Sequence, residues 1–510
     1  MNWIDRAVSA WNPVAGVRRL AARRALSEHS RAYDAARRDH RTASWQATGN
    51  SANAEVGAAE ELVRNRSRDL IRNNGWALQI VETFADHVVG TGIVTAPTGL
   101  KGRNLKRAQQ LWADFAENCD FDGDQDLNGL MWSAVKCMAE SGAAIIRFRR
   151  IAFDARTTTV PLRLQLIEPD FIDVMKNGTT ADGGWIDRGI EYDGQGRRVA
   201  MWLLERHPGD AAMWRSWSMR SERVPADELV YLFNKLRPGQ DRGMPLLAPA
   251  IIPLQDLKGY FDAELVRKRI GACMVGVIYS TEEGSVQIGT KPGQKPTYGP
   301  QTQKMEPGLF TRLLPGESIN FNSLPADGSF DAVATQFLRQ AAAAAGVMYE
   351  HATGDFSRVN YSSWRAGHHG FRRRMERIQW NVVIHMLCRP IAARFNEAAF
   401  AAQMVAAAPT WRHTPPGFIS VDPYKDAQAD LLNLRIGKVS LPQLVEERGY
   451  DYVEFLMAYA EGLKQADEAF AGLGVGVMFD GDPRKAAKGT APANDKADAS
   501  AEQTDAAAAA

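Results

Sequence analysis

A regular spacing of hydrophobic positions marks the segment 362–386. Apolar or aromatic residues recur there at steps of three or four, which predicts one buried stripe on a helix of at least about five turns. The stripe consists of Trp364, His368, Phe371, Met375, Ile378, Val382 and Met386. We expect Ser362 or Ser363 to be the N-cap. Residues from Thr353 to Ser362 include side chains that bond their own backbone, so they predict a polar loop before the helix.

Helical spacing also appears in other segments. Residues 59–93 predict a helical pair divided at Asn73–Gly75, with core positions Leu62, Leu70, Ile71, Ala77, Ile80, Val81 and Phe84. Further helices are expected at about 105–117, 127–140 and 330–345. One more helix is expected to end at Gly437, and another to begin after it. Beyond Pro253, another helical stripe consists of Leu254, Leu257, Phe261, Leu265 and Ile270.

Between residues 143 and 234 the period changes to two, which predicts a mainly antiparallel sheet with a hairpin turn at Asp193–Gly196. A second, smaller β-rich unit is expected at 275–325, interrupted by a Gly, Pro and Lys-rich spacer. After Phe479 the chain contains no large apolar side chain, and residues 479–510 predict a disordered tail. The combination of helices and antiparallel strands indicates an α+β protein that is mainly helical.

The composition is that of a globular protein. At 510 residues the chain predicts about two or three structural units. Hydrophobic residues make up 45% of the chain, charged residues 24%, and the mean hydropathy is −0.31. No apolar run approaches the roughly 18 residues of a membrane span, and the N-terminus lacks the apolar segment of a secretory signal. We therefore expect an intracellular protein with no membrane association.

Charge is balanced overall but not locally. The formal net charge is +1, from 61 Lys plus Arg against 60 Asp plus Glu, so the chain lacks the basic excess of proteins that grip nucleic acid tightly. Residues 1–41 nevertheless hold nine arginines against four acids. The arginines at 23–41, 267–269 and 372–377 are open to three interpretations, which are phosphate contacts, ion pairs between subunits and solvated faces.

The candidate metal ligands are incomplete. Asp124, Asp126, Asn128 and Gly129 match the start of a calcium loop, but Val135 occupies the position of the bidentate glutamate. An acidic helix N-cap explains this cluster better. His368 and His369 are adjacent, so they point about 100 degrees apart on a helix and cannot chelate one ion. Four cysteines, Cys119, Cys137, Cys273 and Cys388, show no CxxC spacing and predict neither a zinc site nor a disulfide framework.

Motifs of nucleotide and hydrolase chemistry are also missing from the sequence. The segment GTGIVT at Gly90–Thr95 lacks the third glycine of a dinucleotide fingerprint and follows a predicted helix rather than a strand. The sequence contains no P-loop, no G-x-S-x-G and no H-E-x-x-H. We expect a protein that is not an enzyme, with no catalytic residues, no metal and no cofactor.

Several blocks follow one another along the chain: RSRDLIRNNGWALQIVETFADHVVGTGI, LQLIEPDFID, GIEYDGQGRRVAMWLL, RPGQDRGMPLLAPAI, DLKGYFDAELVRKRIGACMVGVI, EPGLFTRLLPGESI, GDFSRVNYSSWRAGHHGFRRRMERIQ, LCRPI and VDPYKDAQA. In this order they resemble the portal protein of lambda-type tailed bacteriophages, from about Tyr33 to Glu454. The resemblance implies a non-enzymatic ring, typically a dodecamer, at one capsid vertex. Double-stranded DNA would pass through its axial channel during packaging and ejection.

The same resemblance implies a division of the chain into wing, stem, clip and crown. The expected parts are an Arg-rich, partly disordered arm (1–60), a wing (61–243), a first stem helix (244–274), a β-rich clip (275–328), a second stem helix with a channel loop (329–361), a long wing helix (362–408), a C-terminal helical crown (409–478) and a disordered tail (479–510).

Two groups of site residues follow from this division. The candidate channel-facing loop consists of Tyr349, His351, Asp355, Arg358, Asn360 and Tyr361. The candidate basic residues for subunit packing or DNA contact are Arg365, Arg372, Arg373, Arg374 and Arg377. The implied partners are further copies of the chain, double-stranded DNA, the terminase large subunit, a major capsid or scaffolding protein and a head completion protein. The implied location is the virion, with assembly in the host cytoplasm. Another capsid or connector component, or a DNA-processing enzyme, is the alternative.

Overall fold

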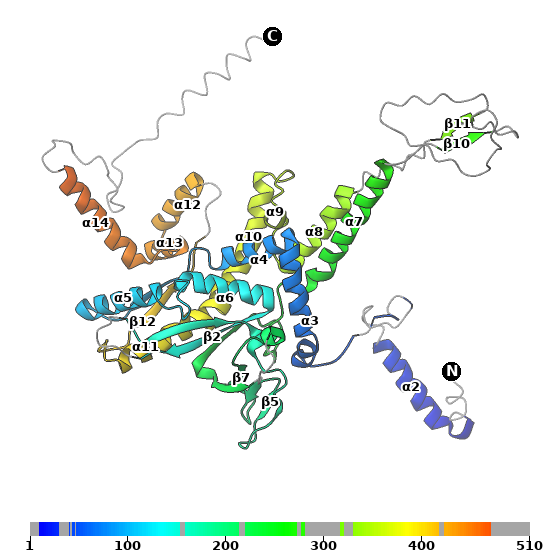
Figure 1. Ribbon diagram of the computed structural model, residues 1–510, viewed down its shortest axis with the longest axis horizontal. Coiled ribbons are helices and arrows are strands. Elements are labelled where there is room, and N and C mark those ends of the chain that lie inside the picture. The colour runs from blue at the N-terminus through cyan, green and yellow to red at the C-terminus, as the bar shows by residue number, and fades with distance from the viewer. Residues whose placement is uncertain are drawn as a thin grey trace, which may run out of the picture. The chain divides into compact units, whose positions relative to one another are not determined.

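The computed structural model describes residues 10–29, 40, 43–45, 47–152, 159–213, 220–272, 277–280, 317–320, 330–417 and 423–470. Its helices and strands confirm the predicted α+β class, in which helices predominate (Figure 1). None of the described helices has an apolar stretch long enough to cross a membrane. Cys273 and the predicted tail 479–510 lie outside the described residues.

The α-helices are α2 (Pro13–His29), α3 (Ala52–Asn73), α4 (Gly75–Val88), α5 (Gly102–Glu117), α6 (Leu127–Ser141), α7 (Ile251–Ala272), α8 (Phe330–Ala345), α9 (Tyr349–Thr353), α10 (Tyr361–Ile378), α11 (Arg389–Ala401), α12 (Pro423–Arg435), α13 (Leu441–Glu447) and α14 (Tyr452–Phe470). Short 3-10 turns are η2 (Pro169–Phe171), η3 (Pro208–Met213), η4 (Ala226–Glu228) and η5 (Ala248–Ala250), and η6 (Gln379–Cys388) is a π-helix.

The strands form antiparallel ladders, as predicted. They are β1 (Val94–Thr98), β2 (Ala143–Arg150), β3 (Leu162–Ile167), β4 (Gly178–Thr179), β5 (Trp185–Asp187), β6 (Ile190–Tyr192), β7 (Arg198–Leu204), β8 (Ser221–Pro225), β9 (Leu229–Phe233), β10 (Val277–Ser280), β11 (Glu317–Asn320) and β12 (Thr410–Thr414). Their orders are β1-β12, β10-β11, β3-β2-β9 and β4-β5-β6-β7-β8. Of the predicted clip, only β10 and β11 are described.

The chain divides into a small unit, residues 1–59 and 235–242, and a large unit, residues 60–234 and 243–510. In the small unit, Arg237 pairs with Glu55 at 2.6 Å. Asn53 Nδ2 donates to Asp241 Oδ2 at 3.0 Å, and Asp241 N donates back to Asn53 Oδ1 at 2.8 Å. These contacts join the first turn of α3 to the loop 235–242. The predicted arm also contains α2, while its residues 1–9 and 30–39 lie outside the described residues.

The main core of the large unit lies among α4, α6, the sheet β3-β2-β9 and the continuous helix formed by α10, η6 and α11. Large side chains such as Phe84, Phe115, Leu130, Ile146 and Phe395 are fully buried there. A second core lies between this sheet and the five-stranded sheet, and it contains Ile145, Ile172, Ile190, Met201, Val224 and Tyr231. Strand β2 therefore buries both faces along its first half, because consecutive side chains of a strand point to opposite sides.

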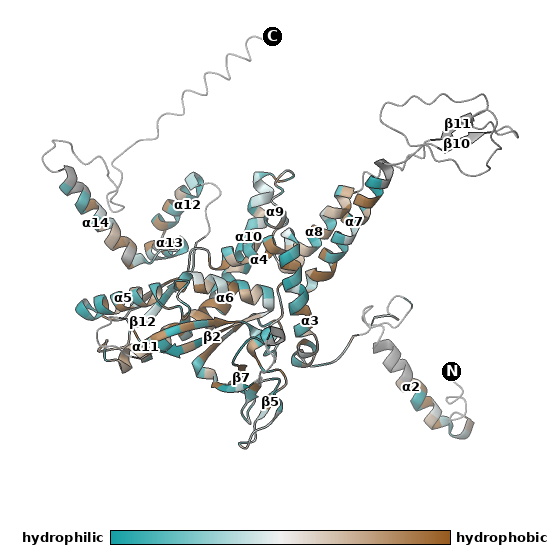
Figure 2. Ribbon diagram, in the orientation of Figure 1, coloured by the Kyte–Doolittle hydropathy of each residue, from teal (hydrophilic) through white to brown (hydrophobic). Residues whose placement is uncertain are grey.

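Two predicted core residues are in fact exposed. Leu62 is 55% exposed, although its neighbours Leu70 and Ile71 are buried as expected. Leu265 is 48% exposed, although Leu254 and Leu257 earlier on α7 are buried as expected. Tyr260 stacks on Phe330 with ring centroids 5.6 Å apart. Other hydrophobic residues of α7, such as Ile252 and Val266, are exposed to solvent, and the hydrophobic turns of this helix are seen in Figure 2.

The long helix confirms most of the predicted stripe and changes it after Ile378. Phe371, Met375, Ile378 and Val382 are buried as predicted. From Gln379 the helix is π-helical, with a wider turn than the 3.6 residues assumed for the stripe. Additional residues then reach the core, namely Val383, Ile384, Leu387 and Cys388. This π-helical segment packs against β9, a partner that a helical period read from the sequence does not contain.

Candidate channel loop and basic helix

The segment after α8 is more ordered than the predicted loop. Residues Tyr349–Thr353 form the short helix α9, which ends at Gly354 with φ +70°. Asp355 then organises the turn, because its Oδ1 accepts a hydrogen bond from Ser357 N at 3.0 Å and its Oδ2 accepts one from Tyr349 Oη at 3.2 Å. Hydrogen bonds from Ser357 lower the pKa of Asp355. The loop proper therefore spans only residues 354–360.

The N-cap of α10 is Asn360, and the predicted N-caps Ser362 and Ser363 are wrong. Asn360 Oδ1 accepts from Ser363 N at 2.8 Å, and Ser363 Oγ accepts from Asn360 N at 3.1 Å. This reciprocal pair is a capping box, with the serine at the third helical position instead of the usual Glu or Gln. Asn360, which we assigned to the loop, thus fixes where the loop ends.

The open part of this segment carries aromatic and basic side chains. Phe356 is 53% exposed and Tyr361 46%. Arg358 is also exposed, and its Nη2 lies 2.8 Å from Asp331 Oδ2 at the start of α8. An ion pair between two exposed groups contributes little to stability, so Arg358 can exchange this partner at small cost.

His351 lies inside the chain's own packing rather than on this open surface. Its ring is 4.9 Å from those of His87 on α4 and Phe371 on α10, and 5.1 Å from Trp364. Burial, together with the neighbouring histidines, lowers the pKa of His351 to about 4. The side chain is therefore neutral at pH 7. It packs α9 against α4 and α10.

The basic residues of α10 separate into three groups. Arg365 Nη2 lies 3.2 Å from Asp426 of α12, and Arg372 Nε lies 2.8 Å from Glu376 in the next turn. Arg374 is half-buried under α8. Arg373 and Arg377 are exposed and make no ion pair or hydrogen bond with the residues that the structure describes. Glu376, the one acid within this cluster, pairs with Arg372 and leaves Arg373 and Arg377 without an acidic partner among the described residues.

Arg374 lies against the C-terminal end of α8. Its Nη2 donates to the carbonyl oxygen of Ala345 at 3.0 Å. Burial and the nearby Arg377 lower its pKa. Gly346 has φ +71°, and a Cβ atom at this position would overlap the Arg374 guanidinium. Glycine is required here for two reasons, the left-handed backbone and the close approach of this side chain.

Sequence reasoning missed a buried ion network between α3 and the sheet region. Asp170 Oδ2 lies 2.7 Å from Arg68 Nη2 and 3.2 Å from Arg64 Nη1. Burial alone would raise the pKa of Asp170, but the two arginines bring it below its usual value. Arg64 also lies 3.9 Å from Glu60. The spacing of Glu60, Arg64 and Arg68 at steps of four was the available signal, but their partner comes from a distant segment.

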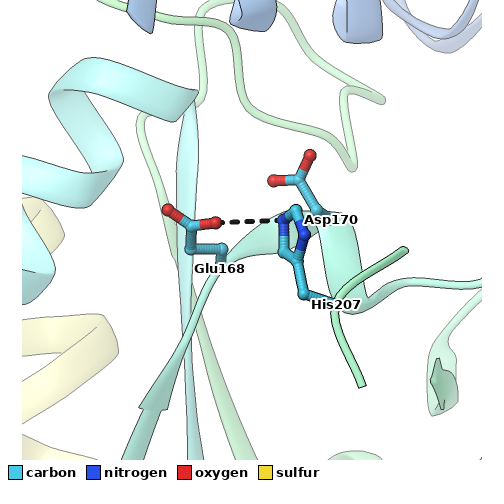
Figure 3. A group of neighbouring side chains, drawn as sticks. All are labelled: Glu168, Asp170 and His207. Atoms are coloured by element: carbon cyan, nitrogen blue, oxygen red, sulfur yellow. Dashed lines mark ion pairs between the residues drawn. The ribbon is translucent and has the colours of Figure 1, made fainter. Parts of the chain in front are cut away.

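Glu168, Asp170 and His207 lie close enough to hold a cation (Figure 3). Glu168 Oε2 is 3.2 Å from His207 Nε2 and 3.3 Å from Arg68 Nη2. Two guanidinium groups already neutralise these carboxylates, and a divalent ion would be repelled by both. The arrangement is therefore that of a structural ion network rather than a metal site.

The other candidate metal ligands and thiols are structural as well. Asp126 Oδ1 caps α6 by accepting from Gly129 N at 2.7 Å, and Asp120 Oδ2 accepts from Asp124 N at 3.0 Å. Among the described residues, the acids of this loop do not converge on a common ligand position. Cys119 and Cys388 are free thiols, and burial raises the pKa of each to about 12. Thiols with such a pKa are not nucleophiles at neutral pH.

Similar proteins indicate the class to which this fold and these surfaces belong. The probable portal protein of Halomonas phage phiHAP-1 is 26% identical over 88% of this chain and 90% of its own length. Portal protein B of Escherichia phage lambda is 21% identical over 81% of this chain and 85% of its own length. The portal protein of Escherichia phage N15 is 22% identical over 83% of this chain and 87% of its own length. The class is thus that of phage portal proteins.

The model of the family "phage portal protein, lambda family" matches residues 38–379, so the chain belongs to this family. The family is structural rather than enzymatic, as predicted. Among solved structures, a gene transfer agent neck computed with C12 symmetry has 13% identity and a TM-score of 0.42, covering 74% of this chain and 92% of its own. An HK97-family portal protein from Corynebacterium diphtheriae has 12% identity and a TM-score of 0.32, and the match covers 72% of this chain and 98% of that protein. Both TM-scores lie below 0.5, so the assignment rests on the sequence matches.

Proposed function

We propose that this chain assembles with copies of itself into a ring, a dodecamer, at one vertex of a phage capsid. Double-stranded DNA passes through the axial channel of the ring during packaging and ejection. The observation that carries this proposal is the family match over residues 38–379. The ring is part of the virion, and it assembles in the host cytoplasm.

The charge of the chain supports a conduit for DNA. Proteins that neutralise many phosphates hold DNA tightly, because each contact releases counterions. With a net charge of +1, this chain has no general excess of positive charge to hold a moving duplex. A ring also repeats each contact in every subunit, so weak contacts in each copy are sufficient.

The arrangement of the parts follows the family division. The wing comprises the helices and sheets of 61–243 and the long helix of 362–408, the stem comprises α7 and α8, the clip 275–328, and the crown 409–478. The small buried side chains Ala341, Ala342 and Ala345 allow close packing of α8. Terminase, a major capsid or scaffolding protein and a head completion protein are the partners that such a ring requires.

The loop between α9 and α10 is the candidate channel surface. Of the residues assigned to it, Arg358, Asn360 and Tyr361 are exposed, together with Phe356. Tyr349, Asp355 and Asn360 shape the loop through the hydrogen bonds described above, and His351 anchors α9. DNA contact is therefore assigned to Phe356, Arg358 and Tyr361.

The exposed arginines of α10 are candidates for contact with a neighbouring subunit. Arg373 and Arg377 lie on one side of the helix with Trp380, which is 48% exposed. Closed rings require two different complementary faces on each subunit, and a basic face with an exposed aromatic residue is suited to such a contact. DNA is the other possible ligand of these arginines.

Electron microscopy of the purified full-length chain tests the proposal. We expect negatively stained rings with an axial hole wide enough for duplex DNA, and a sedimentation coefficient of a large closed oligomer. Monomers or dimers across the concentrations used for assembly would contradict it. A compact particle that cleaves DNA would instead favour the alternative of a DNA-processing enzyme.

A further inference from the structure

Strand β2 pairs with its two neighbours over different lengths. Strand β3 continues beside it as far as Arg150, which faces Leu162, whereas β9 begins at Leu229 opposite Arg147. Along residues 148–150, the side of β2 that continues the line of β9 faces no other described strand. The backbone N–H and C=O groups on such an edge can pair with an added strand.

A cavity of about 770 Å³ lies along this edge. One wall consists of β2 and the following residue, from Arg147 to Ile151, and the opposite wall is the C-terminal half of α11, from Arg394 to Ala401. Figure 1 shows α11 near β2. The lining of the cavity includes the apolar residues Phe148, Leu162 and Ala398. The cavity is therefore a groove lined by both apolar and charged residues, with a strand edge at its side. Its volume is that of a typical ligand site.

The charges along the groove are not balanced. The charged lining residues are four arginines and two glutamates: Arg147, Arg149, Arg150, Arg394, Glu228 and Glu397. Two of the arginines have carboxylate partners, since Arg147 lies 2.9 Å from Glu222 and Arg394 lies 2.6 Å from Glu397. Arg149 and Arg150 form no ion pair with the residues that the structure describes, and Arg149 donates only to the neutral Gln165 at 2.8 Å.

The sheet also places two positive charges directly opposite each other. Arg149 on β2 faces Arg163 on β3, and like charges in this position destabilise an antiparallel pair. Arg163 has no carboxylate partner among the described residues, and its Nη1 donates to the carbonyl oxygen of Leu162. Burial and the neighbouring Arg147 lower the pKa of Arg149. The sheet thus retains a repulsion that a bound carboxylate would relieve.

We propose that this groove binds a short acidic segment of another protein, which adds as a strand beside residues 148–150 of β2. Backbone pairing supplies affinity in this mode of recognition, and side chains at alternate positions supply specificity. Carboxylates on one face of the added strand contact Arg149, and side chains on its other face meet Arg150 and the apolar residues Phe148 and Ala398, because consecutive side chains of β2 point to opposite sides. The proposal concerns a single subunit and does not depend on ring formation.

A peptide fits the groove better than nucleic acid does. Glu228 and Glu397 lie in the same lining and repel a backbone that carries a charge at every nucleotide. A peptide can place its carboxylates at the arginines and neutral side chains at the glutamates. The apolar lining also has no complement in a phosphodiester backbone.

Fluorescence anisotropy with the full-length protein tests this inference. The probe is a fluorescein-labelled peptide of alternating glutamate and valine, and the matched control peptide carries glutamine in place of glutamate. We expect saturable binding of the acidic peptide and at least about tenfold weaker binding of the control. The double variant R149Q/R150Q weakens acidic-peptide binding by at least about tenfold, whereas R72Q, at an exposed arginine of α3, leaves it unchanged.

A second variant separates the groove from its charge. Ala401→Trp fills the groove and retains every arginine, and we expect it to abolish binding of the peptide. Thermal unfolding of R149Q/R150Q should occur at no lower temperature than that of the parent protein, because a repulsion has been removed, so lost binding would not reflect unfolding.

Three results would overturn the inference. Equal binding of both peptides, or full binding to Ala401→Trp, would show that the probe does not use this groove. Duplex DNA that competes with the peptide, and whose own affinity falls equally in R149Q/R150Q, would assign the arginines to phosphate. Dissociation of existing oligomers by the peptide would assign the groove to a second copy of the chain.

Discussion

Asp170 provides the sharpest test of how the ion network stabilises the large unit. The substitution Asp170→Asn keeps the size of the side chain and removes its negative charge. Arg64 and Arg68 then lose their shared carboxylate, and their side chains are only 7% and 13% exposed. Removing one partner of a buried ion pair costs about 3–5 kcal/mol. Glu60 and Glu168 remain near the two arginines, so we expect a value near the lower end, about 3 kcal/mol.

Urea unfolding followed by tryptophan fluorescence measures this change, under conditions in which the protein is a dissociated subunit. The matched control is Asp69→Asn, also on α3, where Asp69 and Arg72 pair at 3.8 Å with side chains 68% and 67% exposed. An exposed pair contributes about 0–1 kcal/mol, so the control should unfold close to the parent protein. The urea concentration at the midpoint, multiplied by the slope of the free energy against urea concentration, gives the free energy of unfolding in water for each variant.

The effect of pH provides an independent check. Because the folded-state pKa of Asp170 is lowered, its contribution to stability is present above the unfolded pKa of about 3.9 and is lost as pH falls through the folded value. The difference between Asp170→Asn and the parent should therefore be full at pH 7 and shrink in strong acid. A variant that unfolds within about 0.5 kcal/mol of the Asp69→Asn control at pH 7 would refute this account of the network.

Other predictions concern the segment around α9 and α10. Stability should fall as pH decreases from about 6.5 to about 4, since neutral His351 is buried and only the unfolded chain takes up its proton in this range. His351→Phe should flatten part of that slope in acid titrations followed by circular dichroism. The remainder comes from His413, whose pKa is also about 4, and from His368, whose pKa is lowered by burial. Gly346→Ala should destabilise the chain more than Gly437→Ala in urea unfolding. Both glycines have positive φ, a conformation that costs about 1–2 kcal/mol for alanine, but only at Gly346 would the added Cβ atom meet a side chain. Equal losses of stability in the two variants would contradict this close contact. Replacing Arg373 and Arg377 with alanine should leave subunit stability within about 0.5 kcal/mol but reduce the yield of rings counted by electron microscopy. Normal rings that fail only to package DNA would instead place these arginines at the channel.

The sequence predicted the local features whose causes lie within a few residues. Most helices, the antiparallel strands of 143–234, the hairpin at Asp193–Gly196, the cap at Asp126 and most of the stripe from Phe371 to Val382 follow from such short-range patterns, whereas α9 and the pairing of β1 with β12 were not predicted. The residues assigned to the channel loop lie on one continuous segment of the structure, but their environments differ. Asn360 caps a helix and His351 is packed inside, while Arg358 and Tyr361 remain open, and no spacing rule distinguishes these cases.

By itself, the sequence determined the α+β class, the order of most elements and, through the order of its sequence blocks, the resemblance to the portal family. Helical and strand periods are properties of the backbone, so they can be read from the chain without its fold. Only the tertiary structure decided which charges are paired. Asp170 meets Arg64 across more than one hundred residues of sequence, and Arg149 lies opposite Arg163 because of strand register. Which charged residues pair depends on their distances in the folded structure, and the local pattern of a sequence does not specify these distances.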